Sequence, residues 1–108
     1  MKNYLFVCRA GITRSPAAAS AAEELAEKKK KKILTEHVGL YSGAKISAEK
    51  ISTFDKIFVM EKGMEKILRQ EYHYKKPIIS LDIKDKDKYK SNDPELYKTI
   101  MSKLRRHI

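Results

Sequence analysis

Tyr4-Leu5-Phe6-Val7-Cys8-Arg9-Ala10-Gly11-Ile12-Thr13-Arg14-Ser15-Pro16 is the stretch of sequence that decides the fold. It begins with an apolar run containing β-branched and aromatic residues, which predicts a buried strand over residues 3–8. It ends in Ser15-Pro16 before an alanine-rich segment, and serine at the N-cap with proline next predicts a helix start. A strand, a short loop and a helix N-terminus together favour anion binding, because backbone N–H groups and the helix dipole converge there.

The spacing of Cys8 and Arg14 adds a nucleophile and a cation to this predicted loop. A thiol attacks as its thiolate, a form that a helix N-terminus and a nearby cation favour. The intervening residues allow the loop to curl, so that the guanidinium of Arg14 returns beside Cys8 and holds two phosphoryl oxygens. Ser15 can donate a hydrogen bond to the thiolate and ease its departure from a phospho-cysteine intermediate.

Composition and length predict one soluble globular domain over residues 1–108, with 42% hydrophobic and 35% charged residues. We expect neither a signal peptide nor a membrane span, because residues 1–7 are too short and no long apolar run follows. The single cysteine cannot form an internal disulfide, which indicates a cytoplasmic protein. The sequence has no metal motif and no dinucleotide-binding fingerprint, so we expect no metal and no cofactor. It does not indicate an oligomeric state.

The chain is strongly basic, with a net charge of +10 from 24 basic and 14 acidic residues. Residues 28–32 are successive lysines, which surround a helix axis instead of forming one face, and therefore predict a solvated helix end. The excess charge favours solubility or the steering of an anionic partner, and we do not expect that partner to be nucleic acid. His37, His73 and His107 have no metal-ligand spacing and are expected at the surface.

The remaining elements follow from hydrophobic periodicity and from turn residues. Alanines at helical spacing predict a helix packed closely against a sheet, over residues 15–31. Strands are expected at 38–42, 56–60 and 78–81, helices at 46–54 (or a turn), 63–72 and 93–106, and a charged loop at 82–92. Such alternation predicts a parallel sheet covered on both faces, with its ligand site at the carboxyl ends of the strands.

Val7-Cys8-x5-Arg14-Ser15-Pro16 resembles the phosphate-binding loop of low-molecular-weight protein tyrosine phosphatases. Residues 55–62 are similar to the third strand of a short bacterial branch, and residues 81–96 resemble its acid loop and last helix. The resemblance implies a flavodoxin-like, doubly wound α/β fold with four parallel strands in the order 2-1-3-4. It also implies a phosphomonoesterase that acts on phosphotyrosine or a similar aryl phosphate through a phospho-cysteine. The phosphate-binding loop would then comprise Arg9, Ala10, Gly11, Ile12, Thr13 and Arg14.

The sequence departs from the family pattern at several positions. Gly11 stands where the family has an asparagine that braces the loop, although glycine still allows the left-handed backbone angles that the loop needs. Arg9 places an unusual charge in the loop, and Ala19 replaces a common glutamate. The family's Ser-Ala-Gly after its second strand appears as Ser42-Gly43-Ala44. These changes put the catalytic rate in question, and not the fold.

The resemblance places a general acid in the loop after the fourth strand. In the family, this acid lies two residues before a tyrosine that walls the cleft, and Asp87-Lys88-Tyr89 reproduces that spacing. The alignment needs two extra residues after Ile83, whereas counting without a gap selects Asp85. We therefore expect Asp87 to be the acid, with Asp85 as the alternative. Asp82 is expected to belong to the strand end and to cap or orient the loop.

Four functions compete at this stage. Phosphomonoester hydrolysis implies a phosphorylated protein or a small aryl phosphate as substrate, and inorganic phosphate or another oxyanion in the loop. Arsenate reduction by thiols, which the same fold hosts, requires partner cysteines that the chain lacks. A phospho-cysteine carrier does not usually have Arg14-Ser15 in its loop. A phosphate-binding module without turnover remains open because of Gly11 and Arg9. Hydrolysis is our prediction.

Overall fold

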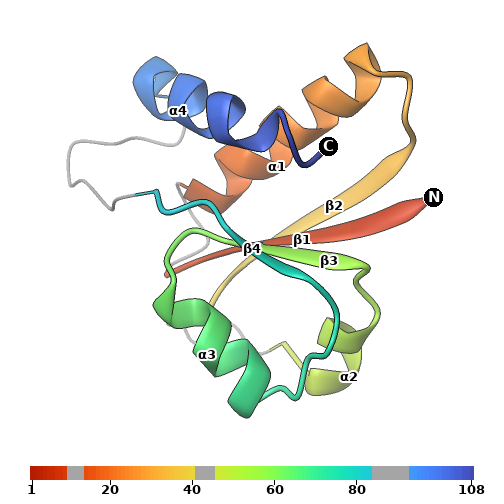
Figure 1. The fold of residues 1–108 in the computed structure, drawn as a ribbon, viewed down its shortest axis with the longest axis vertical. Coiled ribbons are helices and arrows are strands. Elements are labelled where there is room, and N and C mark those ends of the chain that lie inside the picture. The colour runs from red at the N-terminus through yellow and green to blue at the C-terminus, as the bar shows by residue number, and fades with distance from the viewer. Residues whose placement is uncertain (10–13, 41–45, 84–92) are drawn as a thin grey trace.

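The computed structural model describes residues 1–9, 14–40, 46–83 and 93–108, which form a parallel α/β sheet. Its strands are β1 (Lys2–Cys8), β2 (Ile33–Gly39), β3 (Lys56–Val59) and β4 (Ile78–Ser80). They lie in the order β2-β1-β3-β4, and every neighbouring pair is parallel (Figure 1). The predicted topology is confirmed.

Helices cover both faces of the sheet, as the prediction of a doubly wound fold requires. Figure 1 shows α1 (Arg14–Lys28) and α4 (Pro94–Leu104) on one face, and α2 (Ala48–Ser52) and α3 (Gly63–Gln70) on the other. Side chains alternate along a strand, so the two faces of β1 belong to two separate hydrophobic cores. The core under α1 and α4 receives Tyr4, Phe6 and Cys8, and the core under α2 and α3 receives Leu5 and Val7.

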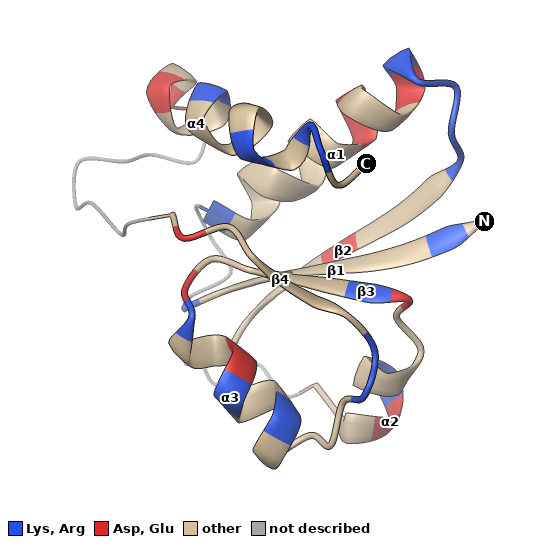
Figure 2. Ribbon diagram, viewed as in Figure 1, with Lys and Arg blue, Asp and Glu red and all other residues tan. Residues whose placement is uncertain are grey.

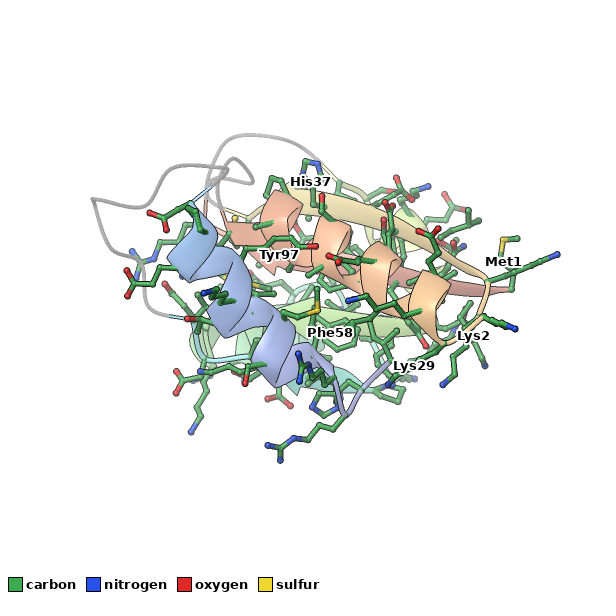
Figure 3. All side chains as sticks on the ribbon, turned by 90° about the horizontal axis from the view of Figure 1, so that it is seen from above. Met1, Lys2, Lys29, His37, Phe58 and Tyr97 are labelled. Atoms are coloured by element: carbon green, nitrogen blue, oxygen red, sulfur yellow. The ribbon has the colours of Figure 1, made fainter. Side chains whose placement is uncertain are left out.

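The core beneath α1 and α4 is built from aromatic rings on the sheet and small residues on the helix. Phe58 of β3 lies under these two helices and stacks on Phe6, with ring centroids 4.9 Å apart (Figure 3). The helix contributes small buried side chains, as its sequence predicted: Ala17, Ala18, Ala21, Ala22 and Ala26. Because alanine is short, the backbone of α1 can approach the sheet closely and carry its N-terminus to the end of β1.

The second strand was predicted wrongly. It was expected at residues 38–42 but runs over Ile33–Gly39, paired along its length with β1. It is an edge strand whose exposed positions include Leu34 and Glu36, so hydrophobic periodicity marks it poorly. Other boundaries differ by one to three residues: α1 ends at Lys28, α3 at Gln70, α4 at Leu104, β3 at Val59 and β4 at Ser80.

The lysine run forms the exposed end of α1 and the turn that follows it, as predicted (Figure 2). Lys29 donates hydrogen bonds from Nζ to the carbonyl oxygen of Arg105, at 2.8 Å, just after α4, and to an oxygen of the last residue, Ile108. Cations are favourable beside such carbonyls because the last carbonyls of a helix lack partners within it. No helix among the described residues combines the length and apolar character that crossing a membrane requires.

The three histidines do not all lie at the surface. His37 and His73 are exposed, as expected, but His107 is half-buried, with its ring centroid 6.1 Å from that of Phe58. Burial lowers the pKa of His107, and the neighbouring charges of Lys56 and Arg106 act in the same direction. The surface prediction for His107 was wrong because the turn after α4 folds back onto the sheet.

Candidate functional site

Cys8 lies at the carboxyl end of β1 and is held there by both neighbouring strands. Its carbonyl oxygen accepts a hydrogen bond of 3.0 Å from the N–H of Leu40, just beyond β2. On the other side, the N–H of Met60 donates to the carbonyl of Val7 at 2.9 Å. Cys8 is only 2% exposed, so its sulfur sits on a rigid and largely buried part of the sheet.

Ser15 contacts the sulfur of Cys8, as the sequence predicted, with 3.1 Å between Sγ and Oγ. Its position in the helix differs from the prediction, however. Helix α1 begins at Arg14, which makes Ser15 its second residue instead of its N-cap. The fully buried hydroxyl of Ser15 is engaged with Cys8, and this contact accounts for the difference. When the sulfur is a thiolate, the hydroxyl is the donor of this hydrogen bond.

Arg14 is a buried cation whose hydrogen-bonding partners include groups from the segments that follow β3 and β4. It is 3% exposed, and its Nη1 donates to Oε1 of Glu61 at 3.0 Å and to the carbonyl oxygen of Ile83 at 2.8 Å. A buried guanidinium needs such partners, because taking a charge out of water is otherwise unfavourable by several kcal/mol. The first turn of α1, the end of β3 and the segment after β4 therefore meet at Arg14.

Arg9 binds the same carboxylate from the solvent side. Its Nε donates to Oε1 and Oε2 of Glu61 at 3.0 and 3.2 Å, and its side chain is 57% exposed. Burial acts to raise the pKa of Glu61, but the hydrogen bonds and charges of Arg9 and Arg14 outweigh it, so the pKa is lowered. Glu61 is therefore an ionised bridge between the two arginines at neutral pH, and not a proton donor.

A residue with a left-handed backbone conformation precedes Ile83, whose carbonyl lies at the site. Asp82 has a φ of 51°, a conformation that aspartate tolerates better than most residues. After this turn, the N–H of Ile83 donates to the carbonyl of Met60 at 2.8 Å, and Lys103 donates to the carbonyl of Asp82 at 2.9 Å. Asp82 lies beyond the end of β4 at Ser80 and was wrongly assigned to the strand end.

Several predicted site residues lie outside the described parts of the chain. These are Ala10, Gly11, Ile12 and Thr13 of the loop, Asp85 and Asp87 as acid candidates, and Tyr89 as a wall of the cleft. Residues 42–44 are outside as well. Their roles remain predictions. Ala19, which replaces a common family glutamate, is buried within α1.

Sequence reasoning missed two groups at the site, the carboxylate of Glu61 and the carbonyl of Ile83. Glu61 lies two residues beyond the carboxyl end of β3, the strand beside β1 in the predicted order. An acidic residue at that position could have been assigned to the site from the sequence, because the carboxyl ends of parallel strands lie at the same edge of the sheet. No signal of this kind exists for a backbone carbonyl, which every residue has.

The described groups bring a thiol, a hydroxyl and a buried guanidinium to the start of α1, and they contain no obvious place for a metal. The thiol of Cys8 contacts the hydroxyl of Ser15, and the buried Arg14 precedes Ser15 in the first turn of α1, where the helix dipole favours negative charge. Among residues 1–9, 14–40, 46–83 and 93–108, no three His, Cys, Asp or Glu side chains are grouped as a metal ion would require.

The lowered pKa of Glu61 predicts that its contribution to stability depends on pH. The carboxylate stabilises the fold while ionised, above the pKa of glutamate in the unfolded chain, about 4.3. That contribution is lost as the pH falls through the lower pKa of the folded protein. Glu61→Gln should therefore lower the free energy of unfolding at neutral pH, and its difference from wild type should shrink between about pH 5 and pH 2.

Urea denaturation at a series of pH values measures this difference. Glu71→Gln, at an exposed position just after α3, is the matched control and should show little difference from wild type at any pH. If the free energy of unfolding of Glu61→Gln stays below that of wild type by the same amount down to the lowest pH, the role of Glu61 as an ionised bridge is contradicted.

Comparisons with known proteins find this fold among solved structures. No protein-family model matches the chain, and no curated protein matches its sequence. The low molecular weight protein tyrosine phosphatase of T. tengcongensis matches with a TM-score of 0.76 at 15% identity, covering 100% of both chains. A mutant of YwlE from Bacillus subtilis matches with a TM-score of 0.73 at 14% identity, over 98% of this chain and 93% of that chain. Wzb from Vibrio vulnificus, in complex with benzylphosphonate, matches with a TM-score of 0.68 at 16% identity, over 97% and 92%. The chain has the fold of low molecular weight protein tyrosine phosphatases.

Proposed function

We propose that the protein is a phosphomonoesterase that hydrolyses aryl phosphates, such as phosphotyrosine, through a phospho-cysteine intermediate. The observation that carries the proposal is the contact of 3.1 Å between Cys8 and Ser15 beside the buried guanidinium of Arg14. The fold, which it shares with several phosphatases, adds support. The single cysteine also supports the proposal that it works in the cytoplasm.

In the first step, the sulfur of Cys8 attacks phosphorus, and a sulfur–phosphorus bond forms while the ester bond to the aryl oxygen breaks. Arg14 binds phosphoryl oxygens and stabilises the charge that they carry in the transition state. The leaving oxygen takes a proton from an acid on the loop after β4, for which Asp87 is preferred over Asp85. The loop residues 9–13 contribute backbone N–H groups to the phosphoryl oxygens.

In the second step, water attacks phosphorus, the sulfur–phosphorus bond breaks, and inorganic phosphate leaves. The departing sulfur regains the hydrogen bond from Ser15, which stabilises it as a thiolate. The deprotonated acid of the first step accepts a proton from the attacking water. This cycle uses one cysteine, whereas arsenate reduction by thiols needs partner cysteines.

An aryl leaving group is preferred over the guanidinium of a phosphorylated arginine. One structural neighbour of this fold is named an arginine phosphatase, and its structure holds a phosphorylated active-site serine. In the present chain, Arg9 places an exposed cation beside the site. An exposed cation repels a cationic leaving group, although the ionised Glu61 beside Arg9 offsets part of that repulsion, whereas a neutral aromatic ring is repelled by neither charge.

Replacing the nucleophile tests the proposal. We expect wild-type protein to hydrolyse para-nitrophenyl phosphate, and we expect Cys8→Ser to lower kcat by more than about a thousandfold, because the serine hydroxyl is a far weaker nucleophile. Release of para-nitrophenol is measured by absorbance. Ser20→Ala, at an exposed position of α1, is the matched control and should retain wild-type activity.

Equal rates for wild type and Cys8→Ser would refute Cys8 as the nucleophile. If wild-type protein binds inorganic phosphate in calorimetry but shows no turnover, the alternative of a phosphate-binding module replaces the proposed enzyme.

The general acid is tested by comparing Asp87→Asn with Asp85→Asn. Protonation of the leaving group contributes typically ~10²–10⁴-fold to the rate. The variant of the true acid should lose the alkaline limb of its pH–rate profile and depend more steeply on the pKa of the leaving phenol. Each variant serves as the control for the other. We expect this signature in Asp87→Asn. Its appearance in Asp85→Asn alone would show that the family alignment needs no extra residues after Ile83, and that Asp85 is the acid.

A further inference from the structure

A small cavity lies beside the end of β4, the last turn of α4 and the turn that follows this helix. Its volume is about 260 Å³, and its described lining residues are Ser80, Leu81, Lys103, Arg106 and His107. Figure 2 shows basic residues on the second half of α4 and on the turn after it. Sites for drug-sized molecules have volumes of about 300–1,000 Å³, so this cavity suits a small ion or a single polar group.

The two charged side chains in this lining are cations. Neither Lys103 nor Arg106 forms an ion pair with an acidic side chain of the described residues. Lys103 donates a hydrogen bond of 2.9 Å to the carbonyl oxygen of Asp82, which holds its ammonium group beside the end of β4. An ammonium group has three donors, so Lys103 can donate to a ligand while it keeps this bond.

Ser80 adds a hydroxyl group that has no hydrogen-bonding partner among the described residues. Its Oγ is buried, and it is the only buried side-chain nitrogen or oxygen there without a partner. Such groups in native proteins almost always bond to protein, water or a ligand, because a buried polar group without a partner is unfavourable. A ligand oxygen in the cavity that Ser80 lines can act as this partner.

His107 is placed to report on the charge of the cavity. Burial lowers the pKa of His107, and the positive charges of Lys56 and Arg106 act in the same direction. An anion bound in the cavity would oppose these charges and raise that pKa, because a nearby negative charge favours the protonated imidazole. His37 and His73 are exposed and do not line the cavity, so they serve as internal controls.

We propose that this cavity is a second anion site, which binds a phosphate-type oxyanion through Lys103, Arg106 and Ser80. These donors come from α4, the turn after it and β4, so they belong to more than one wall of the cavity. A tetrahedral oxyanion has acceptor oxygens on several sides and suits such donors better than a planar carboxylate. The oxyanion is either free inorganic phosphate or the phosphoryl group of a larger ligand. The inference does not depend on the proposed phosphatase activity.

A second cavity on the other side of His107 is less suited to this ligand. Its lining combines lysines with large apolar or aromatic side chains, and includes Lys2, Lys31, Lys32, Met1, Tyr4 and Ile33. The buried hydroxyl without a described partner, that of Ser80, lines the first cavity and not the second. The two cavities are therefore distinguished by variants as well as by chemistry.

Proton NMR titration of the three histidines tests the proposal. Their C2 protons are followed from about pH 5 to about pH 8 at constant ionic strength, in sodium chloride alone or with added inorganic phosphate. We expect phosphate to raise the pKa of His107 by roughly 0.5 to 1 pH unit and to leave those of His37 and His73 nearly unchanged. If the three histidines respond alike, or if none responds, the proposal is wrong.

Variants of the lining identify the donors. Arg106→Gln and Ser80→Ala should each weaken phosphate binding roughly three- to tenfold, measured as the phosphate concentration that gives half of the change in the pKa of His107. Arg105→Gln is the matched control, because it removes an exposed charge one residue away that does not line the cavity. Thermal unfolding shows whether each variant is folded. Unchanged affinity in both folded lining variants would overturn the proposal.

Two further variants separate this cavity from other places where phosphate can bind. Lys32→Gln tests the cavity on the other side of His107, and Arg14→Lys tests the candidate catalytic site. We expect both variants to keep the rise in the pKa of His107 that wild-type protein shows with phosphate. If either variant loses that rise while Arg106→Gln keeps it, the anion binds elsewhere and the proposal is wrong.

Methylphosphonate and acetate identify the ligand more closely. Methylphosphonate carries a methyl group in place of one phosphate oxygen, and so resembles the phosphoryl group of a larger molecule. If it raises the pKa of His107 at the same concentrations as phosphate, the site accepts a phosphoryl group with a substituent. A response to inorganic phosphate alone assigns the site to the free ion. Acetate that acts as well as phosphate would overturn the assignment to a phosphate-type oxyanion.

Discussion

The burial of the Arg14 guanidinium is the constraint on which the candidate site depends. A charge that is 3% exposed must be matched by partners, and among the described residues these include the carboxylate of Glu61 and the carbonyl of Ile83. The two partners follow β3 and β4, while Arg14 begins α1. One side chain therefore links the start of α1 to the segments that follow β3 and β4.

Backbone hydrogen bonds hold the described residues around Cys8 in place. The backbone on both sides of Cys8 is tied to its neighbours at Leu40 and Met60, and Met60 in turn receives the N–H of Ile83. Donors that are fixed in advance stabilise a bound anion without reorganising for it, which is the arrangement that catalysis of phosphoryl transfer requires. Glu61 extends this network outward to the exposed Arg9.

The positions of Cys8, Arg14 and Ser15 at the end of β1 and the start of α1 could be predicted because they follow from local structure, while their roles in catalysis remain predictions. Cys8 ends a strongly apolar strand and Arg14-Ser15 begins an alanine-rich helix, so their convergence needs only a loop between them. The second strand was misplaced because it is an edge strand with exposed polar positions, and its extent is fixed by pairing with β1. Glu61 and the carbonyl of Ile83 were missed because only tertiary packing brings them to Arg14. The roles of Asp85 and Asp87 remain predictions, since both lie outside the described residues.

The central claim is that Arg14 clamps the phosphoryl group, and calorimetric titration of Arg14→Lys with vanadate and inorganic phosphate tests it most directly. Lysine keeps the charge but loses the planar fork, so we predict that oxyanion affinity falls by at least about tenfold, the loss of a charge-assisted hydrogen bond. Arg69→Lys, at an arginine of α3 that binds the carbonyls of Tyr74 and Lys76, is the matched control and should bind like wild type. Thermal unfolding shows whether each variant is folded at the temperature of the titration. A folded Arg14→Lys protein with unchanged oxyanion affinity would contradict the account.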